Sequence, residues 1–269
     1  MNGRVLIVAG SDSGGGAGIQ ADIKAVTALG GYAATAVTAL TAQNTQGVFG
    51  IHPVPPDFIA QQMQLVLDDI GADAIKIGML HSAAVIETVA AEIEARAPGL
   101  PVVVDPVMVA KGGARLLEDA AVEALRTRLL PLARIVTPNI PEAETLAGET
   151  LAGPEAMEAL ARRLLALGPR AVLLKGGHMD GETVRDVLID GDEAAVFESP
   201  RIETRHTHGT GCTLASAIAA GLAQGLDLAP AVARARAYVW TAIQKAPGFG
   251  KGHGPLDHGH TMGPVEGAG

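Results

Sequence analysis

The sequence predicts a single α/β domain in which a mostly parallel β-sheet is covered by helices on both faces. Short apolar runs of strand length alternate with longer helical patterns along the 269 residues. This alternation is typical of parallel sheets, whose crossover helices lie on the two faces. Hydrophobic residues make up 48% of the chain and aromatic residues only 3%, so the core is expected to consist of Ala, Val, Leu and Ile. No internal repeat or linker divides the chain.

The first predicted elements are a strand, a glycine-rich turn and a helix. Residues 4–9 (RVLIVA) form an apolar run, residues 10–18 (GSDSGGGAG) form the turn, and residues 19–29 have a helical pattern that ends at Gly30-Gly31. In α/β proteins this arrangement is typical of ligand sites. The turn matches neither the Walker A nor the GxGxxG pattern, so it predicts no P-loop or dinucleotide site.

The remaining elements follow a regular rhythm of strands and helices. Strands are predicted over residues 32–40, 47–54, 73–79, 102–106, 133–139, 171–178, 184–190 and 193–200. Helices are predicted over residues 56–69, 82–95, 118–129, 142–147, 154–167, 210–224 and 228–245. The last two strands should form a hairpin over Gly191-Asp192. The glycine-rich tail from Gly248 is predicted to be poorly ordered from about residue 250, above all near its end.

Charge and cysteine content argue against several function classes. The formal net charge is −9 and no block of Lys or Arg occurs, which disfavours nucleic acid and anionic membranes as partners. The single cysteine excludes an internal disulfide and a CxxC metal site. The first apolar run is too short for a signal peptide, and no apolar run of transmembrane length occurs. We therefore expect a cytoplasmic protein.

The most informative stretch is His208-Gly209-Thr210-Gly211-Cys212-Thr213, a glycine-rich turn that opens an apolar helix. The first turn of a helix has backbone N–H groups without intrahelical partners and carries the positive end of the helix dipole. Gly209 and Gly211 remove side chains where an anion would approach. Residues 209–211 therefore predict an anion hole for a phosphate or a developing phosphoryl charge.

Cys212 lies in the first turn of the same helix, and two interpretations are open. A helix N-terminus lowers the pKa of a thiol, which would make Cys212 a reactive thiolate and a candidate base for the acceptor hydroxyl. Alternatively, Cys212 is a small buried residue at a tight helix start. The two bracketing glycines favour the functional interpretation.

Polar residues follow several predicted strands, and the carboxyl ends of parallel strands meet at one edge of a sheet. Asn139 and Glu142 form an Asn-x-x-Glu pattern there, which suits either Mg²⁺ beside nucleotide phosphates or a helix capping box. Lys175, followed by two glycines, is a candidate phosphate contact. Asp105 is either structural or close to a metal.

Two further polar residues are candidates for the substrate pocket. Asp22 lies one helical turn after Gly18 and either faces the crevice or is solvated. The amide of Gln43 either contacts a polar heterocycle or belongs to an ordinary turn. The loop histidines 178, 206 and 208 are interpreted as hydrogen-bonding residues, and the tail histidines 253, 258 and 260 do not have the spacing of a metal site. Together the candidates predict phosphoryl transfer, in which positioning and electrostatics carry most of the catalysis.

These residues resemble the bacterial hydroxymethylpyrimidine/phosphomethylpyrimidine kinases of thiamine biosynthesis, within the ribokinase-like superfamily. The resemblance extends over nearly the whole chain, through AGSDSGGGAGIQAD, TALTAQNTQGV, KIGML, VVDPVMVAKGG, VTPNIPEAE, LLKGGH, THGTGCTLASAIA and GKGHGP. Many sugar kinases of the superfamily have Gly-Ala-Gly-Asp where this chain has Gly-Thr-Gly-Cys, which is similar to the pyrimidine kinases and to some pyridoxal kinases. One departure is Ser13-Gly14, where many members have Pro-Ser.

The resemblance implies a three-layer α/β/α fold and two successive phosphorylations of 4-amino-5-hydroxymethyl-2-methylpyrimidine, with ATP and Mg²⁺. It implies a pyrimidine pocket lined by Gly10, Asp22, Gln43, Met79 and Val107. It further places Cys212 beside the reacting hydroxyl, residues 209–211 as the anion hole, Asn139 and Glu142 near Mg²⁺ and phosphate, and Lys175 near the nucleotide. The family is usually dimeric, so a homodimer is expected.

Because both an alcohol and its phosphate must fit one site, a moving loop is expected, and residues 110–113 are the candidate lid. The nearest alternative function is pyridoxal kinase activity, since pyridoxal is also a flat heteroaromatic ring with a hydroxymethyl group. An alternative of another class is a non-catalytic regulator that binds a pyrimidine or a nucleotide.

Overall fold

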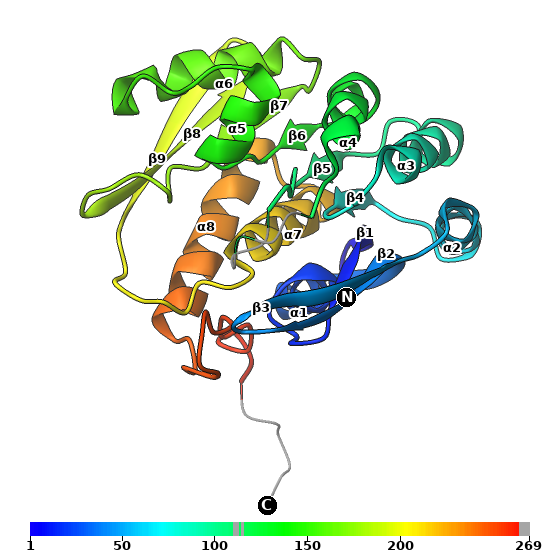
Figure 1. Cartoon of the computed structure of the whole chain (residues 1–269), viewed down its shortest axis with the longest axis horizontal. Coiled ribbons are helices and arrows are strands. Elements are labelled where there is room, and N and C mark those ends of the chain that lie inside the picture. Colours follow the sequence, from blue (N-terminus) through cyan, green and yellow to red (C-terminus); the bar gives the residue numbers. More distant parts are fainter. Residues whose placement is uncertain (110–112, 114–115, 264–269) are drawn as a thin grey trace, which may run out of the picture.

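The computed structural model describes residues 1–109, 113 and 116–263, and these residues build one large sheet between two layers of helices (Figure 1). The strands are β1 (Arg4–Asp12), β2 (Tyr32–Asn44), β3 (Gly47–Pro53), β4 (Ala74–Ile77), β5 (Val102–Val104), β6 (Ile135–Val136), β7 (Ala171–Leu174), β8 (Thr183–Asp190) and β9 (Glu193–Pro200). Their order in the sheet is β3-β2-β1-β4-β5-β6-β7-β8-β9. The strands from β2 to β7 in this order are parallel, and β3, β8 and β9 add antiparallel edges.

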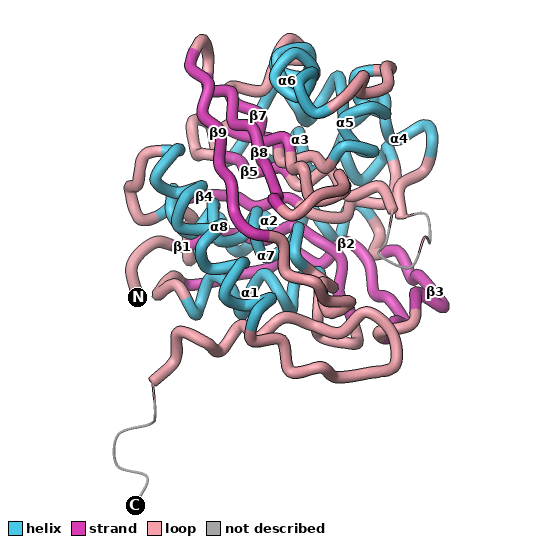
Figure 2. The backbone as a smooth tube through the Cα atoms, turned by 90° about the vertical axis from the view of Figure 1, so that its left-hand side faces the viewer, coloured by secondary structure: helices cyan, strands magenta, loops and turns pink. Residues whose placement is uncertain are grey.

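Helices cover both faces of the sheet, as the alternating sequence pattern predicts (Figure 2). They are α1 (Gly18–Ala28), α2 (Pro56–Asp69), α3 (Ala83–Arg96), α4 (Asp119–Ala124), α5 (Ile140–Ala147), α6 (Met157–Leu165), α7 (Thr210–Ala223) and α8 (Leu228–Gln244). One buried apolar cluster joins the sheet to α1, α7 and α8, and a larger one joins the opposite face to α2–α6. The predicted three-layer, mostly parallel α/β fold is confirmed.

Element boundaries differ from the prediction where the chain leaves the sheet. The middle strands β5 and β6 are shorter than predicted, because the chain leaves the sheet at Asp105 and Thr137. The side chains of these two residues therefore lie at the edge of the sheet. In contrast, β1 and β2 extend to residues 12 and 44, since the chain continues into the β2–β3 hairpin. The predicted helix over 118–129 is α4 followed by a π-helical segment, Leu125–Leu129. The predicted hairpin over Gly191-Asp192 is confirmed.

The prediction of a poorly ordered tail is wrong for the residues that the structure describes, up to residue 263. The amide of His208 donates to the carbonyl of Gly254 at 3.1 Å, and the amide of His253 donates to the carbonyl of Thr45 at 2.8 Å. Leu256 and His258 are buried. Composition misled the prediction, because the glycines here allow the tail backbone to approach its neighbours closely rather than to move freely.

None of the helices in the described parts of the chain has the length and apolar content needed to cross a membrane.

Candidate active site

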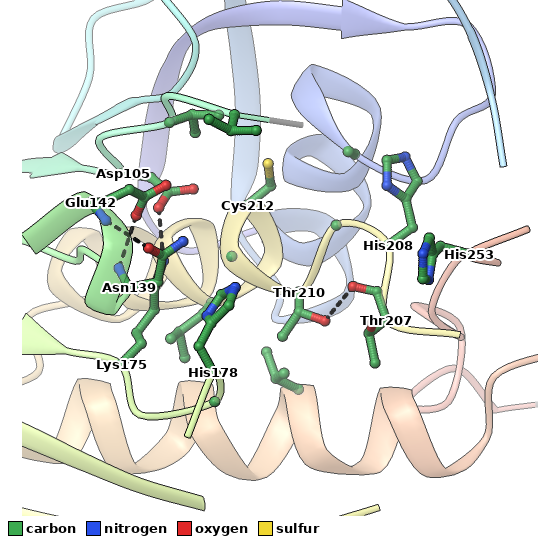
Figure 3. Close-up of a pocket in the computed structure, with 18 of the residues that line it drawn as sticks. Asp105, Asn139, Glu142, Lys175, His178, Thr207, His208, Thr210, Cys212 and His253 are labelled. Carbon is green, nitrogen blue, oxygen red and sulfur yellow. Dashed lines mark hydrogen bonds and ion pairs between the residues drawn. The ribbon is translucent and has the colours of Figure 1, made fainter. Parts of the chain in front are cut away.

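A cavity of about 740 Å³ opens at the carboxyl ends of the parallel strands, in front of the start of α7 (Figure 3). Twelve of the thirteen residues that the sequence singles out for the site lie on its wall. Those residues are Gly10, Gln43, Met79, Asp105, Val107, Asn139, Glu142, Lys175, Gly209, Thr210, Gly211 and Cys212. The predicted residue that does not line it is Asp22. The fold therefore brings together side chains that lie up to 200 positions apart in the sequence.

The start of α7 has the backbone geometry expected of an anion hole. Gly209 is the N-cap residue in a left-handed conformation (φ +82°), and no side chain caps the helix. The amide of Thr210 makes a long bond of 3.4 Å to the carbonyl of Thr207. The amides of Gly211 and Cys212 have no acceptor among residues 1–109, 113 and 116–263. Two N–H donors are thus left for a ligand at the cavity wall.

Gly211 keeps this part of the cavity open. A Cβ atom at Gly211 would lie 3.3 Å from Nζ of Lys175 and 3.4 Å from Oδ2 of Asp105. A side chain would therefore fill the space between the helix start and the Lys175–Asp105 pair, where a phosphoryl group would have to pass.

Cys212 has its thiol at the centre of the cavity, between the polar cluster at one end and His208 at the other (Figure 3). Its side chain is partly exposed, and its sulfur accepts a hydrogen bond from the amide of Gly18. Burial raises the pKa of Cys212 to about 12, and the carboxylates of Asp22 and Asp105 add to the effect of burial. The positive charge of Lys76 lowers the pKa but does not outweigh them. The expectation of a lowered thiol pKa is wrong, because desolvation exceeds the stabilisation that the helix start provides.

Asn139 and Glu142 form the capping box of α5, one of the two interpretations that the sequence left open. The amide of Asn139 donates to Oε2 of Glu142 at 2.8 Å, and the amide of Glu142 donates to Oδ1 of Asn139 at 2.9 Å. Burial raises the pKa of Glu142 to about 7, although Lys175 opposes this shift. A carboxyl group with this pKa titrates near neutral pH, so a bound cation would readily ionise it.

Lys175 and Asp105 form an ion pair beside this capping box, with 3.0 Å between Nζ and Oδ1. Burial favours the neutral amine, but the carboxylates of Asp105 and Glu142 outweigh it and raise the pKa of Lys175. The side chain of Lys175 is therefore a fixed positive charge at the polar end of the cavity, as its prediction as a phosphate contact requires.

The carboxylates at this end do not build a metal site by themselves. Among the described residues, no group of three or more His, Cys, Asp or Glu side chains could hold a metal ion. Asp105 is paired with Lys175, and Glu142 accepts bonds from the amides of Asn139 and Met108. Such a donor set fits Mg²⁺, which keeps several waters and binds proteins through one or two carboxylates beside substrate phosphates.

Gly10, Gln43, Met79 and Val107 also line the cavity. The side-chain amide of Gln43 lies 3.1 Å from Nε2 of His208, and the same nitrogen lies 2.8 Å from Oδ2 of Asp12. Because a carboxylate only accepts, Nε2 of His208 carries the proton that it donates to Asp12. The side-chain oxygen of Gln43 accepts a hydrogen bond of 3.2 Å from the hydroxyl of Thr41. One N–H of Gln43 remains for a ligand.

Ser13, one of the two residues at which this chain departs from the family pattern, holds the loop between β1 and α1 against β2. The hydroxyl of Ser13 donates to the carbonyl of Gln43 at 2.8 Å and accepts from its amide at 2.9 Å. Asp12 accepts bonds from the amides of Gly14 and Ala17 and from His208; these outweigh its burial and lower the pKa of Asp12. His208 is therefore a hydrogen-bonding loop residue, as predicted.

Asp22 lies behind the cavity wall and contacts Lys76, a residue that sequence reasoning missed. Both side chains are fully buried, and Oδ2 of Asp22 lies 2.8 Å from Nζ of Lys76. The signal in the sequence is that Lys76 is the one charged residue in the buried strand AIKI. A charge in a strand covered on both faces predicts a buried partner.

An apolar part of the cavity was also missed. It is lined by Pro200 and Ile202 after β9 and by Val239 and Ile243 of α8. Arg201 donates to the carbonyls of Gly177, Met179 and Gly181 and so joins this segment to the loop after β7. No local pattern could have predicted these residues, because apolar side chains on separate elements form a pocket only once the fold is complete. Of the predicted lid 110–113, residues 110–112 lie outside the described residues.

Comparison with known proteins identifies the relatives of this chain. Residues 12–257 match the family model described as phosphomethylpyrimidine kinase. The hydroxymethylpyrimidine/phosphomethylpyrimidine kinase of Streptomyces coelicolor is 50% identical over 259 residues, which cover 96% of this chain and 95% of the relative. The thiamine biosynthesis bifunctional protein of Geobacter sulfurreducens is 57% identical over 256 residues. The match covers 95% of this chain but spans only about half, 52%, of that longer protein.

A solved structure is similar over the same extent. The pyridoxal kinase of Staphylococcus aureus in complex with AMP-PCP and pyridoxal has a TM-score of 0.88 and 35% sequence identity, and covers 96% of this chain and 94% of its own. Two kinds of small-ring kinase are therefore built on this arrangement of sheet and helices.

Proposed function

Because this chain belongs to the phosphomethylpyrimidine kinase family, we propose that it phosphorylates 4-amino-5-hydroxymethyl-2-methylpyrimidine with ATP, and then phosphorylates the monophosphate to the diphosphate, in thiamine biosynthesis. The observation that carries the proposal is the position of the two unpaired amides of Gly211 and Cys212. They line the same cavity as the ammonium group of Lys175 and the side-chain amide of Gln43.

Each end of the cavity then binds one substrate. The pyrimidine ring lies among Gly10, Gln43, Met79 and Val107, with the free N–H of Gln43 donating to a ring nitrogen. The triphosphate lies between Lys175 and the start of α7, and the adenine enters the apolar part lined by residues 200, 202, 239 and 243. The reacting hydroxyl and the γ-phosphate meet beside Cys212.

Positioning and electrostatic stabilisation perform the transfer. The amides of Gly211 and Cys212 donate to the phosphoryl oxygens, where charge spreads in the transition state. Since the pKa of Cys212 is raised to about 12, the thiol keeps its proton at neutral pH and orients the acceptor hydroxyl. The oxygen of that hydroxyl attacks phosphorus, the bond to the β-phosphate oxygen breaks, and the hydroxyl proton passes to a phosphoryl oxygen.

Mg²⁺ would be held mainly by phosphate oxygens and water, with Glu142 and Asp105 as the protein carboxylates nearest to it. When bound, the ion neutralises charge on the phosphates. Asn139 holds Glu142 in place through the capping box, and Lys175 supplies a second positive charge. For the second phosphorylation the acceptor must move by one phosphate length in the cavity.

The test is a direct assay with purified protein, ATP, Mg²⁺ and the pyrimidine alcohol, in which mono- and diphosphate products are separated by chromatography. We expect both products, the diphosphate appearing after the monophosphate. Absence of any phosphorylated pyrimidine, with ATP intact, would reject the proposal and favour a non-catalytic binding protein. Monophosphate alone would restrict the proposal to the first step.

Pyridoxal is the second candidate substrate, because the Staphylococcus aureus structure that resembles this chain binds pyridoxal. The same assay with pyridoxal in place of the pyrimidine separates the two functions. We expect a kcat/KM at least about tenfold lower for pyridoxal, a difference of about 1.4 kcal/mol in transition-state stabilisation.

We also propose that the protein acts in the cytoplasm as a homodimer. Leu40, Phe49, Phe58 and Leu65 are exposed on β2, β3 and α2, at the edge of the sheet. An apolar group at a sheet edge is typical of a contact between subunits. Light scattering coupled to size-exclusion chromatography should give twice the chain mass, and a monomer at all accessible concentrations would reject the dimer.

A further inference from the structure

A buried polar junction lies where the sheet meets two helices, next to the cavity wall, which Lys76 helps to line. Nζ of Lys76 on β4 contacts both carboxylate oxygens of Asp22 on α1, at 2.9 and 2.8 Å. Oδ1 of Asp22 also accepts a hydrogen bond of 2.7 Å from the hydroxyl of Ser216 on α7. All three side chains are fully buried.

The positions of these residues along the helices relate the junction to the active site. Asp22 lies four residues after Gly18, and Ser216 lies four residues after Cys212. Gly18 and Cys212 are themselves in contact, because the amide of Gly18 donates to the sulfur of Cys212. The helices α1 and α7 are thus joined twice on facing sides, one helical turn apart. One joint is at the cavity and the other lies immediately below it.

Stability alone does not account for a charged junction at this place. Removing an ion pair from water costs several kcal/mol per ion, and well-packed apolar residues often serve a fold equally well. The core cluster on this face of the sheet is apolar, with Ile7, Ala25 and Ala215 fully buried in it. Hydrogen bonds differ from apolar contacts in fixing direction as well as distance. A junction of this kind sets the two helix starts in one relative position.

We propose that Lys76, Asp22 and Ser216 form a positioning anchor that holds the thiol of Cys212 and the free amides of α7 in place against Gly18. Asp22 is then a positioning residue and not a pyrimidine contact, which agrees with its place behind the wall of the cavity. The catalytic part of this inference rests on the proposed kinase function, whereas the structural part does not.

The structural part is tested by alkylation of Cys212, which is the only cysteine of the chain. The rate of iodoacetamide modification at one fixed pH, measured by mass spectrometry without substrates, reports how well this residue is held. Ser216→Ala removes the bond to Asp22 and leaves every charge in place. We expect alkylation about fivefold faster or more, because a lost buried hydrogen bond of about 1 kcal/mol makes local opening that much more frequent.

Arg134→Met is the matched control. It breaks the Arg134–Asp190 ion pair, in which both partners are partly buried and which joins β6 to β8 away from the junction. We expect an alkylation rate within about twofold of wild type. Equal rates in Ser216→Ala, Arg134→Met and wild type would overturn the anchor, as would equal acceleration in both variants.

The catalytic part is tested by the kinetics of Asp22→Asn, with Ser216→Ala as the variant that keeps the test valid if Asp22→Asn does not fold. A positioning role predicts a kcat lower by about tenfold to a hundredfold with KM changed less than about threefold. A raised KM with unchanged kcat would overturn it, because that pattern belongs to a residue that binds the pyrimidine. If wild type shows no kinase activity, the proposed function fails and the alkylation result still decides the anchor.

Discussion

Replacing Gly209 with alanine tests whether the start of α7 is held in the position that phosphoryl transfer requires. Gly209 has a φ of +82°, and a Cβ atom there would collide with the carbonyl oxygen of Gly16 and lie 2.9 Å from its carbonyl carbon. A carbon–carbon contact is comfortable at about 3.5 Å, so the backbone must move by about 0.6 Å or more. The residues that have to move are the glycine-rich turn after β1 and the helix start itself.

Gly225 provides a control at the other end of the same helix. Its φ is +83°, and a Cβ atom there would meet nothing within 4 Å. Gly225→Ala therefore measures the conformational strain alone, about 1 kcal/mol. Gly209→Ala adds the cost of overpacking, about 1–3 kcal/mol, so we expect a total loss of about 2–4 kcal/mol.

The two variants should differ far more in turnover than in stability. Displacing the amides of Gly211 and Cys212 by a sizeable fraction of an ångström should lower kcat by about tenfold to a hundredfold in Gly209→Ala. In Gly225→Ala, kcat should stay within about twofold of wild type. Urea unfolding gives the stabilities, and product formation at saturating ATP and pyrimidine gives kcat. A folded Gly209→Ala protein with the kcat of Gly225→Ala would refute the anion hole.

Three other predictions concern titratable groups. Because burial raises the pKa of Cys212 to about 12, its alkylation rate should keep rising with pH up to about pH 10, and a plateau near pH 7 would contradict this. Burial lowers the pKa of His258 from 6.5 to about 4, so the stability that the neutral, buried imidazole contributes is present above pH 6.5 and is lost as the pH falls through 4. The free energy of unfolding of wild type should therefore fall between pH 7 and 5. In His258→Gln this fall should be smaller by about 2 kcal/mol. Glu142 has the opposite sign, because a pKa raised from 4.5 to about 7 gives stability that is fully present below pH 4.5 and is lost as the pH rises through 7. Relative to Glu142→Gln, wild type should lose about 2 kcal/mol between pH 5 and 8 in urea unfolding, and parallel profiles of the two proteins would show that the carboxyl group is not buried as described.

Much of the fold could be predicted from the sequence, because periodicity reports which face of an element is buried. The runs RVLIVA and AVLL are buried strands, and the alternating helices cover both faces as expected. The existence of one short strand and the length of another depend on pairing with neighbouring strands, which the hydrophobic pattern does not report. The two-residue strand β6 exists only through its neighbours β5 and β7, and the extension of β2 depends on its pairing with β3.

The candidate site was predictable where a motif has local chemistry. Gly209 to Cys212 form the helix start that the Gly-Thr-Gly-Cys stretch indicates, and Asn139 with Glu142 form the capping box that their spacing allows. Properties that depend on the surroundings could not be predicted. The raised pKa of Cys212 comes mainly from burial, and the charged groups that act on it lie on α1, on β4 and directly after β5. The partner of Asp22 lies 54 positions away.

The tail has a consequence for when the enzyme becomes complete during synthesis. In the loop before α7, the amide of His208 donates to the carbonyl of Gly254, and the hydroxyl of Thr213 in the first turn of that helix lies 3.0 Å from Nε2 of His258. These residues near the C-terminus must therefore be synthesised before the start of α7 can form its last stabilising contacts. Proteolytic removal of the tail from Gly254 onward would take away both supports while sparing β1 to β9, so the shortened molecule should lose its chemistry before its fold.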